Sequence, residues 1–449
     1  ASSAFVLIEW FTLLLEYGLY ASESEDKNAK QIFVGLASAL EICQGPTSRP
    51  TVKKTSLRVA RRGLRKLFSV SQENAEYYIP RGVKMMASPC LPEGRSIILL
   101  GVFAGVCARK AEWATICSAY DKLFYEAYVR MILGSKKVVP PHVADGLHDF
   151  FQSFTDEKDL TDEVIKPLER ALLRSPEIVL NNLVTPLIES LPTGKKADAK
   201  LKEVPALDLS NIFKNSLLKP LLANVKSSNA AIRDGALSAF KAGIPRCKNE
   251  IALAAIADEV LNPLRTGKVP AAEHRVLHAE MLRVFPISQG LADKLMPVLA
   301  TIAGKEANES ALNAELSTLS VYVSWTISNK TSLPNPVLAA YAKGASDKKA
   351  PLRRLWTLQI ADILWAQKDE ALTEKSAVEF AEATIPTFAD LFNEVAANGL
   401  AAATSGLAVS AYALTALAST KLAPMKSEKV NAALKKAKIL EQALVFEPK

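Results

Sequence analysis

Apolar residues along most of the chain recur three or four positions apart, which is the spacing of one face of an α-helix. The stretch from Asn211 to Cys247 shows this pattern clearly. Its first half carries a leucine-rich stripe with Pro220 set inside it, and its second half carries a stripe around Phe240. A polar turn at 226–229 separates the two halves. Because neither helix can bury its apolar stripe alone, we expect the pair to stack against similar pairs.

The same two-helix unit recurs along the chain. Upstream of residue 192 we expect one pair at 4–20 and 28–43 and another at 156–174 and 175–191. Downstream we expect pairs at 207–225 and 229–246, 249–265 and 270–285, 288–304 and 308–328, 334–344 and 349–367, and 372–394 and 397–419, followed by a last helix at 426–444. The pattern therefore predicts an all-α fold: an α-α superhelix, or HEAT/armadillo-type solenoid, of stacked antiparallel helix pairs.

Proline recurs inside the first helix of several pairs, at Pro167, Pro220, Pro263, Pro297 and Pro386. If the repeat near Tyr341 lacks it, the 219 residues from the first of these prolines to the last make five steps of about 44 residues. That period lies inside the ~40–47 residues of HEAT and armadillo units. A proline within a helix bends it, which suits helices that wrap around one side of a solenoid.

The predicted solenoid has one break. We expect N-terminal HEAT-like repeats over 1–191, a flexible linker or loop over 192–204, and further repeats of the same solenoid over 205–449. The linker sequence, PTGKKADAKLKEV, is lysine-rich and lacks a helical apolar stripe. The chain starts with an apolar helix where a repeat array would normally have a polar cap, so we expect a fragment of a much longer chain.

The net charge and the cysteine content indicate the kind of partner and the cellular compartment. A net charge of +8 and a pI near 9.0 favour an acidic partner such as nucleic acid, a ribosome surface or an acidic protein, with simple solubility as the alternative. The five cysteines are scattered, without a Cys-x-x-Cys pair: Cys43, Cys90, Cys107, Cys117 and Cys247. This usage favours a reducing, cytoplasmic location and argues against a disulfide framework and a zinc site.

Two basic clusters are candidate contact surfaces. On the predicted helix at 52–70, cations fall on one arc of about 100° beside an apolar stripe that would face the core. These cations, which we call the basic ridge, are Lys54, Arg58, Arg61, Arg62 and Arg65. Such spacing along a rigid rod suits phosphate binding, although acidic residues of an adjacent repeat could also neutralise it.

The second cluster lies where the predicted helix at 349–367 begins. Its members are Lys348, Lys349, Arg353 and Arg354. Cations at a helix N-terminus oppose the macrodipole, so they do not serve helix stability. An external anion and a solvated turn are both compatible with them.

The sequence contains no complete catalytic motif. His274 and His278 lie four apart, as zinc ligands can, but Arg275 stands where a zinc protease needs its glutamate, and no third ligand is apparent. We expect surface or partly buried histidines there. Neither Gly-Lys pair, at Gly194 and Gly267, belongs to a phosphate loop. We therefore expect a non-enzyme without metal, cofactor or small-molecule substrate.

One stretch needs to be considered as a membrane span. Val395–Thr420 contains no charge and is long enough to cross a bilayer. It is dominated by alanine, serine, threonine and glycine, which make it only weakly hydrophobic. We expect a buried inner helix with its connecting turn, and no membrane contact.

Three blocks of sequence, in order, resemble one HEAT family. The first is 131–137, MILGSKK, with Pro140 and Pro141, the second is 165–177, IKPLERALLRSPE, and the third comprises 222–229 and 236–247. The family is that of general control non-derepressible protein one, a large ribosome-associated activator of the general-control kinase. The resemblance covers about residues 1–250 by motif and the remainder by general pattern, and family members are several times longer than this chain.

The resemblance implies a scaffold that lies along stalled or collided ribosomes and helps activate the kinase that phosphorylates initiation factor two during amino-acid starvation. The kinase and an ABC-type partner would bind regions of the full-length protein that are not in this chain. The alternative is a HEAT adaptor or carrier, such as a phosphatase scaffold, an importin-like carrier or a chromosome-associated subunit. The positive charge speaks against a carrier of basic cargo.

Overall fold

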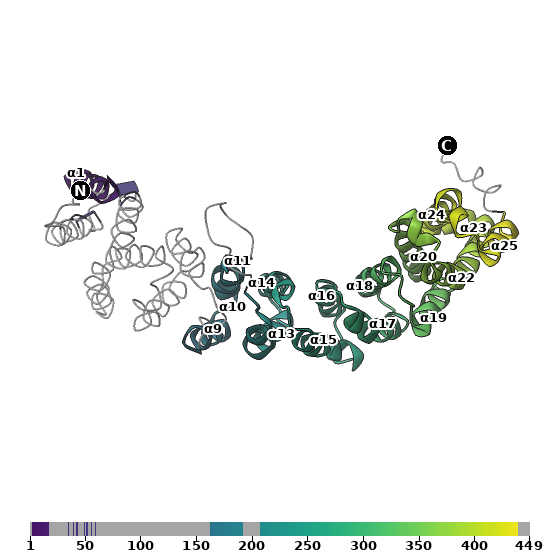
Figure 1. Cartoon of the computed structure of the whole chain (residues 1–449), viewed down its shortest axis with the longest axis horizontal. Helices are drawn as coiled ribbons and strands as arrows, with labels where there is room; N and C mark the ends of the chain where they lie inside the picture. The colour runs from purple at the N-terminus through teal and green to yellow at the C-terminus, as the bar shows by residue number, and fades with distance from the viewer. Residues whose placement is uncertain are drawn as a thin grey trace. The chain divides into compact units, whose positions relative to one another are not determined.

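The computed structural model of the protein describes residues 2–17, 162–191 and 207–438, with single positions between 35 and 59. All regular secondary structure of these residues is helical (Figure 1). The chain divides into two compact units, Ala1–Asn249 and Glu250–Lys449. The expected linker at 192–204 lies outside the described residues, as does most of the chain from 18 to 161.

The first unit contains helical rods that pack in pairs. Its described helices are α1 (Ser2–Tyr17), α9 (Asp162–Arg174), α10 (Pro176–Val179), η2 (Leu180–Val184), α11 (Thr185–Ser190), α12 (Ser210–Ile212), η3 (Phe213–Leu217), α13 (Leu218–Val225), α14 (Ala230–Gly243) and η4 (Ile244–Arg246). The segments α10, η2 and α11 form one continuous rod, and α12, η3 and α13 form another. Helix α14 packs against both rods. An edge-to-face contact of Phe213 with Phe240, 5.3 Å between ring centroids, joins α14 to η3.

Both rods contain one π-helical turn, and a proline explains each. Pro186 follows η2 and Pro220 follows η3. A proline ring crowds the carbonyl group four residues earlier and offers it no N–H. Those carbonyl groups belong to Asn182 and Ser216, which lie inside the two π turns. The wider π turn accommodates the ring without ending the helix.

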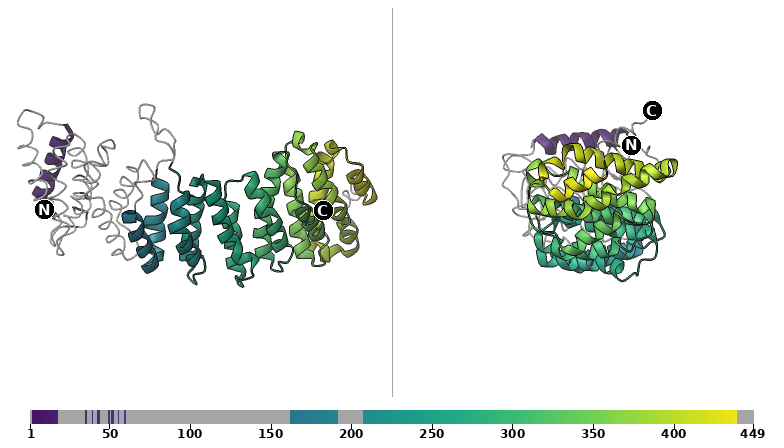
Figure 2. Two further views of the ribbon diagram at one scale, coloured as in Figure 1. Left: turned by 60° about the horizontal axis from the view of Figure 1, so that its bottom comes forward. Right: turned by 90° about the vertical axis from the view of Figure 1, so that its right-hand side faces the viewer.

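The second unit is a two-layer stack of helix pairs. Its helices are α15 (Glu250–Arg265), α16 (Ala272–Arg283), α17 (Gln289–Ala303), α18 (Glu309–Ser328), α19 (Asn335–Gly344), α20 (Ala350–Trp365), α21 (Asp369–Leu372), α22 (Lys375–Ala389), α23 (Leu391–Thr404), α24 (Leu407–Thr420), η5 (Ala423–Met425) and α25 (Glu428–Lys436). In one layer α15, α17, α19, α22 and α25 pack in that order, and in the other α16, α18, α20 and α24 do. Figure 2 shows these pairs side by side. The arrangement confirms the predicted solenoid of antiparallel helix pairs.

Side chains of α18 connect the second layer by hydrogen bonds as well as by apolar packing. The Tyr322 hydroxyl donates to the Leu282 carbonyl oxygen at 2.7 Å, and the Thr318 hydroxyl donates to that of Ala279 at 2.8 Å. Both groups are fully buried. A buried hydroxyl that lost its partner would be destabilising by about 1–3 kcal/mol, so these bonds hold α18 in register on α16.

An aromatic cluster joins α19, α20 and α22 of the second unit. The Tyr341 ring makes edge-to-face contacts with Trp356, at 5.2 Å, and with Phe380, at 5.3 Å. Trp356 also covers Gly344, where an added Cβ would lie 2.1 Å from its Cδ2 atom. Glycine at this position therefore lets α19 approach α20 closely.

Side chains cap the N-termini of several helices. The side chains of Asn229, Ser288, Asn308 and Ser427 accept hydrogen bonds from backbone N–H groups of the first turns that they precede. Ser175 occupies the N-cap position before Pro176, but its side chain makes no capping hydrogen bond.

The region from 372 to 420 differs from the expected two helices. It forms α22, α23 and α24, and the backbone of Gly399 inside α23 is non-helical, with φ 45° and ψ −112°. Gly406, with φ 79°, precedes α24 in the left-handed conformation. The two glycines permit these bends because they lack a Cβ. The expectation of burial was wrong for the end of α23, where Leu400 is 84% exposed. No helix within the described residues is long and apolar enough to cross a membrane.

Candidate functional site

The structure separates the four cations of the second basic cluster into two kinds. Arg353 forms an ion pair with Glu394 of α23, and its side chain is 13% exposed. Arg354 Nη2 lies 3.9 Å from Glu309 Oε2 of α18. Both arginines thus have acidic partners inside the same unit.

The two lysines lie outside the helix body. Lys349 is the N-cap residue of α20, and its backbone N–H donates to Asp347 Oδ1 at 2.8 Å. The side chains of Lys348 and Lys349 are exposed and form no ion pair among the described residues. These two ammonium groups remain available to an external anion.

The basic ridge lies outside the described residues, so Lys54, Arg58, Arg61, Arg62 and Arg65 have no described surroundings. Positions next to them are described as helical, namely Thr51, Val52, Thr55 and Val59. The hydroxyl of Thr12, which is fully buried in α1, donates to the Val59 carbonyl oxygen at 3.2 Å.

The histidine pair on α16 is more buried than expected. His278 is fully buried, with Nδ1 at 2.9 Å from the Val260 carbonyl oxygen of α15, whereas His274 is half-buried. The buried ring therefore connects the two helices of one pair. Among the described residues, no group of three side chains could hold a metal ion.

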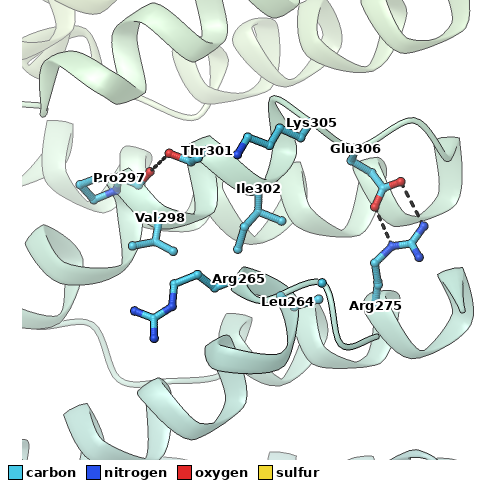
Figure 3. A pocket seen from close by; sticks show the side chains of 10 residues that line it. Leu264, Arg265, Arg275, Pro297, Val298, Thr301, Ile302, Lys305 and Glu306 are labelled. Carbon is cyan, nitrogen blue, oxygen red and sulfur yellow. Dashed lines mark hydrogen bonds and ion pairs between the residues drawn. The ribbon is translucent and has the colours of Figure 1, made fainter. Parts of the chain in front are cut away.

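A pocket that sequence reasoning missed lies between the C-terminal halves of α15 and α17, and we call it the α15–α17 pocket (Figure 3). Its volume is about 580 Å³. Val298 and Ile302 point from α17 toward α15, and Arg265 lies on the opposite side. The remaining lining residues are Leu264, Gly267, Arg275, Pro297, Thr301, Lys305 and Glu306.

The acidic group of this pocket is neutralised within the protein. Arg275 donates from Nε to Glu306 Oε2 at 2.7 Å and from Nη2 to Oε1 at 3.1 Å. The backbone N–H groups of Ala307 and Asn308 donate to the same carboxylate at 2.9 and 2.8 Å. Burial alone would raise the pKa of Glu306, but these hydrogen bonds and the Arg275 charge outweigh it and hold the pKa below its ordinary value.

Two cations of the pocket have no acidic partner among the described residues. Arg265 donates to the amide oxygen of Asn262 at 3.1 Å, which leaves its charge uncompensated, and the Lys305 side chain is exposed. The pocket therefore combines aliphatic walls with net positive charge. Of the lining residues, Gly267, Arg275 and Pro297 belong to features that the sequence analysis considered, but for other reasons. Neither helix pattern by itself predicts the pocket, because its two walls belong to successive pairs.

Two models of protein families match consecutive parts of the chain. The model of the stalled ribosome sensor GCN1 N-terminal region matches residues 121–269, and that of the general control non-derepressible 1 (Gcn1) N-terminal region matches residues 272–449. A curated relative, the eIF-2-alpha kinase activator GCN1 of Saccharomyces cerevisiae, is 23% identical over 217 residues. That match covers 47% of this chain and 7% of the yeast protein, so the match spans a small part of that relative.

Solved structures with a similar arrangement are distant in sequence. Importin beta is 12% identical, with 98% of this chain and 56% of that chain covered and a TM-score of 0.42. Kap121p bound to Nup53p is 12% identical, with 99% and 50% covered and a TM-score of 0.38. These low scores carry no functional argument, and the fold assignment follows from the helix packing.

The two family models occur in order and meet within a few residues, and the yeast relative carries the same name. Neither the models nor the relative is named for a catalytic activity, in agreement with the expected non-enzymatic role. The basic ridge falls outside the matched residues, whereas the α15–α17 pocket falls within them. This chain belongs to the Gcn1 family and forms part of its N-terminal region.

Proposed function

We propose that this chain is a non-enzymatic, cytoplasmic scaffold segment that binds ribosomes, stalled ribosomes among them, and contributes to activation of the eIF2α kinase. The observation that carries the proposal is the ordered match of two Gcn1 N-terminal family models, one of which is named for a stalled ribosome sensor. The yeast relative is named as an activator of that kinase. Binding to the kinase and to an ABC-type partner belongs, in this proposal, to other parts of the longer relatives.

The architecture supports a scaffold role physically. A stack of helix pairs buries its apolar stripes between neighbouring pairs and leaves both flanks of each pair for docking. Ribosomal RNA presents closely spaced phosphates, which are bound by cations held on rigid helices. The basic ridge is our first candidate for this contact, and Lys348 with Lys349 is the second.

Charge reversal of the basic ridge tests the contact. The variant carrying Arg58→Glu, Arg61→Glu, Arg62→Glu and Arg65→Glu is compared with the unchanged chain in ribosome co-sedimentation over a series of salt concentrations. Each lost phosphate contact removes about 0.7–0.9 from the slope of log affinity against log salt, so we expect a slope smaller by about 3. We also expect affinity at physiological salt to fall by about tenfold or more.

In a matched control, glutamate replaces four exposed lysines spread over both units, namely Lys214, Lys226, Lys343 and Lys368. This control changes net charge equally, so a comparable loss of binding would mean that total charge matters and the ridge does not. Unchanged pelleting of the ridge variant would remove the ridge from the proposal. Binding of the unchanged chain to duplex DNA in preference to ribosomes would favour a chromosome-associated adaptor instead.

A further inference from the structure

We propose that the α15–α17 pocket binds a short protein segment in which acidic side chains flank aliphatic ones. This inference concerns a surface other than the basic ridge and does not depend on ribosome binding. The volume of the α15–α17 pocket, about 580 Å³, falls inside the ~300–1,000 Å³ typical of ligand pockets. The pocket is framed by helices of two successive pairs, so it is part of the rigid stack.

The walls of the pocket select aliphatic side chains. Val298 and Ile302 project from α17 and are half-buried, and Leu264 of α15 faces the same space (Figure 3). The hydroxyl of Thr301 donates to the Pro297 carbonyl oxygen at 2.8 Å, so this polar group of the wall is already satisfied. An entering aliphatic side chain would therefore bury apolar surface without leaving that hydroxyl unpaired.

The rim of the pocket selects negative charge. Arg265 is the last residue of α15 and Lys305 lies in the turn after α17, and neither has an acidic partner among the described residues. Glu306 does not offset them, because its carboxylate is occupied by Arg275 and two backbone N–H groups. A carboxylate that enters the pocket meets two cations without an acidic partner, beside apolar walls.

The same features favour a peptide over an RNA strand. RNA recognition relies on several cations along the backbone and on aromatic or guanidinium planes that stack on bases. The lining contains no aromatic side chain, and of its two guanidinium groups that of Arg275 is held by Glu306. Its two unpaired cations, Arg265 and Lys305, lie on either side of an aliphatic surface and do not form a row along a backbone. A segment with alternating acidic and aliphatic residues satisfies both the walls and the rim.

Binding of short labelled peptides to the full chain, followed by fluorescence anisotropy, tests the proposal. In the first peptide glutamate alternates with leucine, in the second lysine replaces glutamate, and in the third serine replaces leucine. We expect the glutamate–leucine peptide to bind with micromolar affinity and each of the others about tenfold or more weakly. We also expect the double variant Arg265→Glu with Lys305→Glu to bind the glutamate–leucine peptide about tenfold or more weakly. Ile302→Ser should lower the affinity for this peptide as well, but with little change in the salt dependence of binding.

Reversal of two exposed lysines elsewhere, Lys435→Glu with Lys436→Glu, is the matched control and should leave peptide affinity unchanged. Circular dichroism melting confirms that each variant folds. The proposal is wrong if the glutamate–leucine peptide fails to bind at millimolar concentration. It is wrong too if the control variant loses as much affinity for this peptide as the variant with Arg265 and Lys305 reversed. It is also wrong if a single-stranded RNA oligonucleotide competes for the pocket and loses more affinity than the peptide when Arg265 and Lys305 are reversed. None of these results bears on ribosome pelleting by the basic ridge.

Discussion

Replacing Glu315 with glutamine tests how much a buried carboxyl group limits the stability of the second unit. Glu315 lies in α18 and is fully buried. Neither of its carboxyl oxygens has a hydrogen-bond partner within the described residues. A carboxylate in such a place loses its hydration without gaining a compensating bond, so the neutral form is favoured in the folded protein.

The pKa of Glu315 shows the same preference. The pKa of Glu315 is raised from 4.5 to about 8, chiefly by burial; the nearby Glu306 carboxylate adds to the rise, and the Arg275 charge offsets part of it. Because the folded pKa lies above the unfolded one, the folded state holds a proton that the unfolded state has released between these values. The free energy of unfolding therefore falls as the pH rises through this window.

The size of the effect follows from the width of the window. Each pH unit inside it removes up to about 1.4 kcal/mol, so this group lowers the free energy of unfolding by roughly 2.5 kcal/mol between pH ~5 and pH ~7. Glutamine has nearly the same shape and stays neutral. We expect Glu315→Gln to exceed the unchanged chain in stability by an amount that grows by roughly 2.5 kcal/mol over this interval.

Urea unfolding followed by tryptophan fluorescence measures this difference, because Trp325, Trp356 and Trp365 lie in α18 and α20. Glu309→Gln serves as the control, since it removes an exposed carboxylate from the same helix and should show no comparable growth with pH. A difference between Glu315→Gln and the unchanged chain that stays constant from acidic to neutral pH would refute the reasoning. A carboxyl resonance of Glu315 that titrates near pH ~4.5 would refute it as well.

Two further predictions concern packing and thiol chemistry. Gly344→Ala should lower the urea midpoint of the second unit, with a cost of about 1–3 kcal/mol from displacement of Trp356, and an unchanged midpoint would contradict the close approach of α19 to α20. Cys247 should resist iodoacetamide in the folded chain, because burial, with a smaller effect of the Asp208 carboxylate, raises its pKa to about 12. Mass spectrometry of the Cys247 peptide should show rapid alkylation only in denaturant, and equal rates with and without denaturant would contradict its burial.

The helical period and the turn residues determined the local structure. The apolar spacing gave the helix pairs of 207–367 to within a few residues, since each helix must keep its stripe on one face. The prolines fell inside first helices as expected, at Pro167 in α9, Pro220 in α13 and Pro263 in α15. The π turns next to Pro186 and Pro220 did not follow from the apolar pattern, because they adjust hydrogen bonding without changing which face is apolar.

The tertiary structure alone decided which charges remain available. Arg353 and Lys349 look alike in the sequence, yet Arg353 pairs with Glu394, 41 residues away, while the Lys349 side chain stays exposed. Arg265 and Lys305 lie on opposite sides of one pocket because α17 stacks on α15. The Glu315 carboxyl group is removed from solvent because α18 packs on α16. Residues about one repeat apart are brought together by the rotation between successive helix pairs, and the local spacing of apolar residues does not encode that rotation.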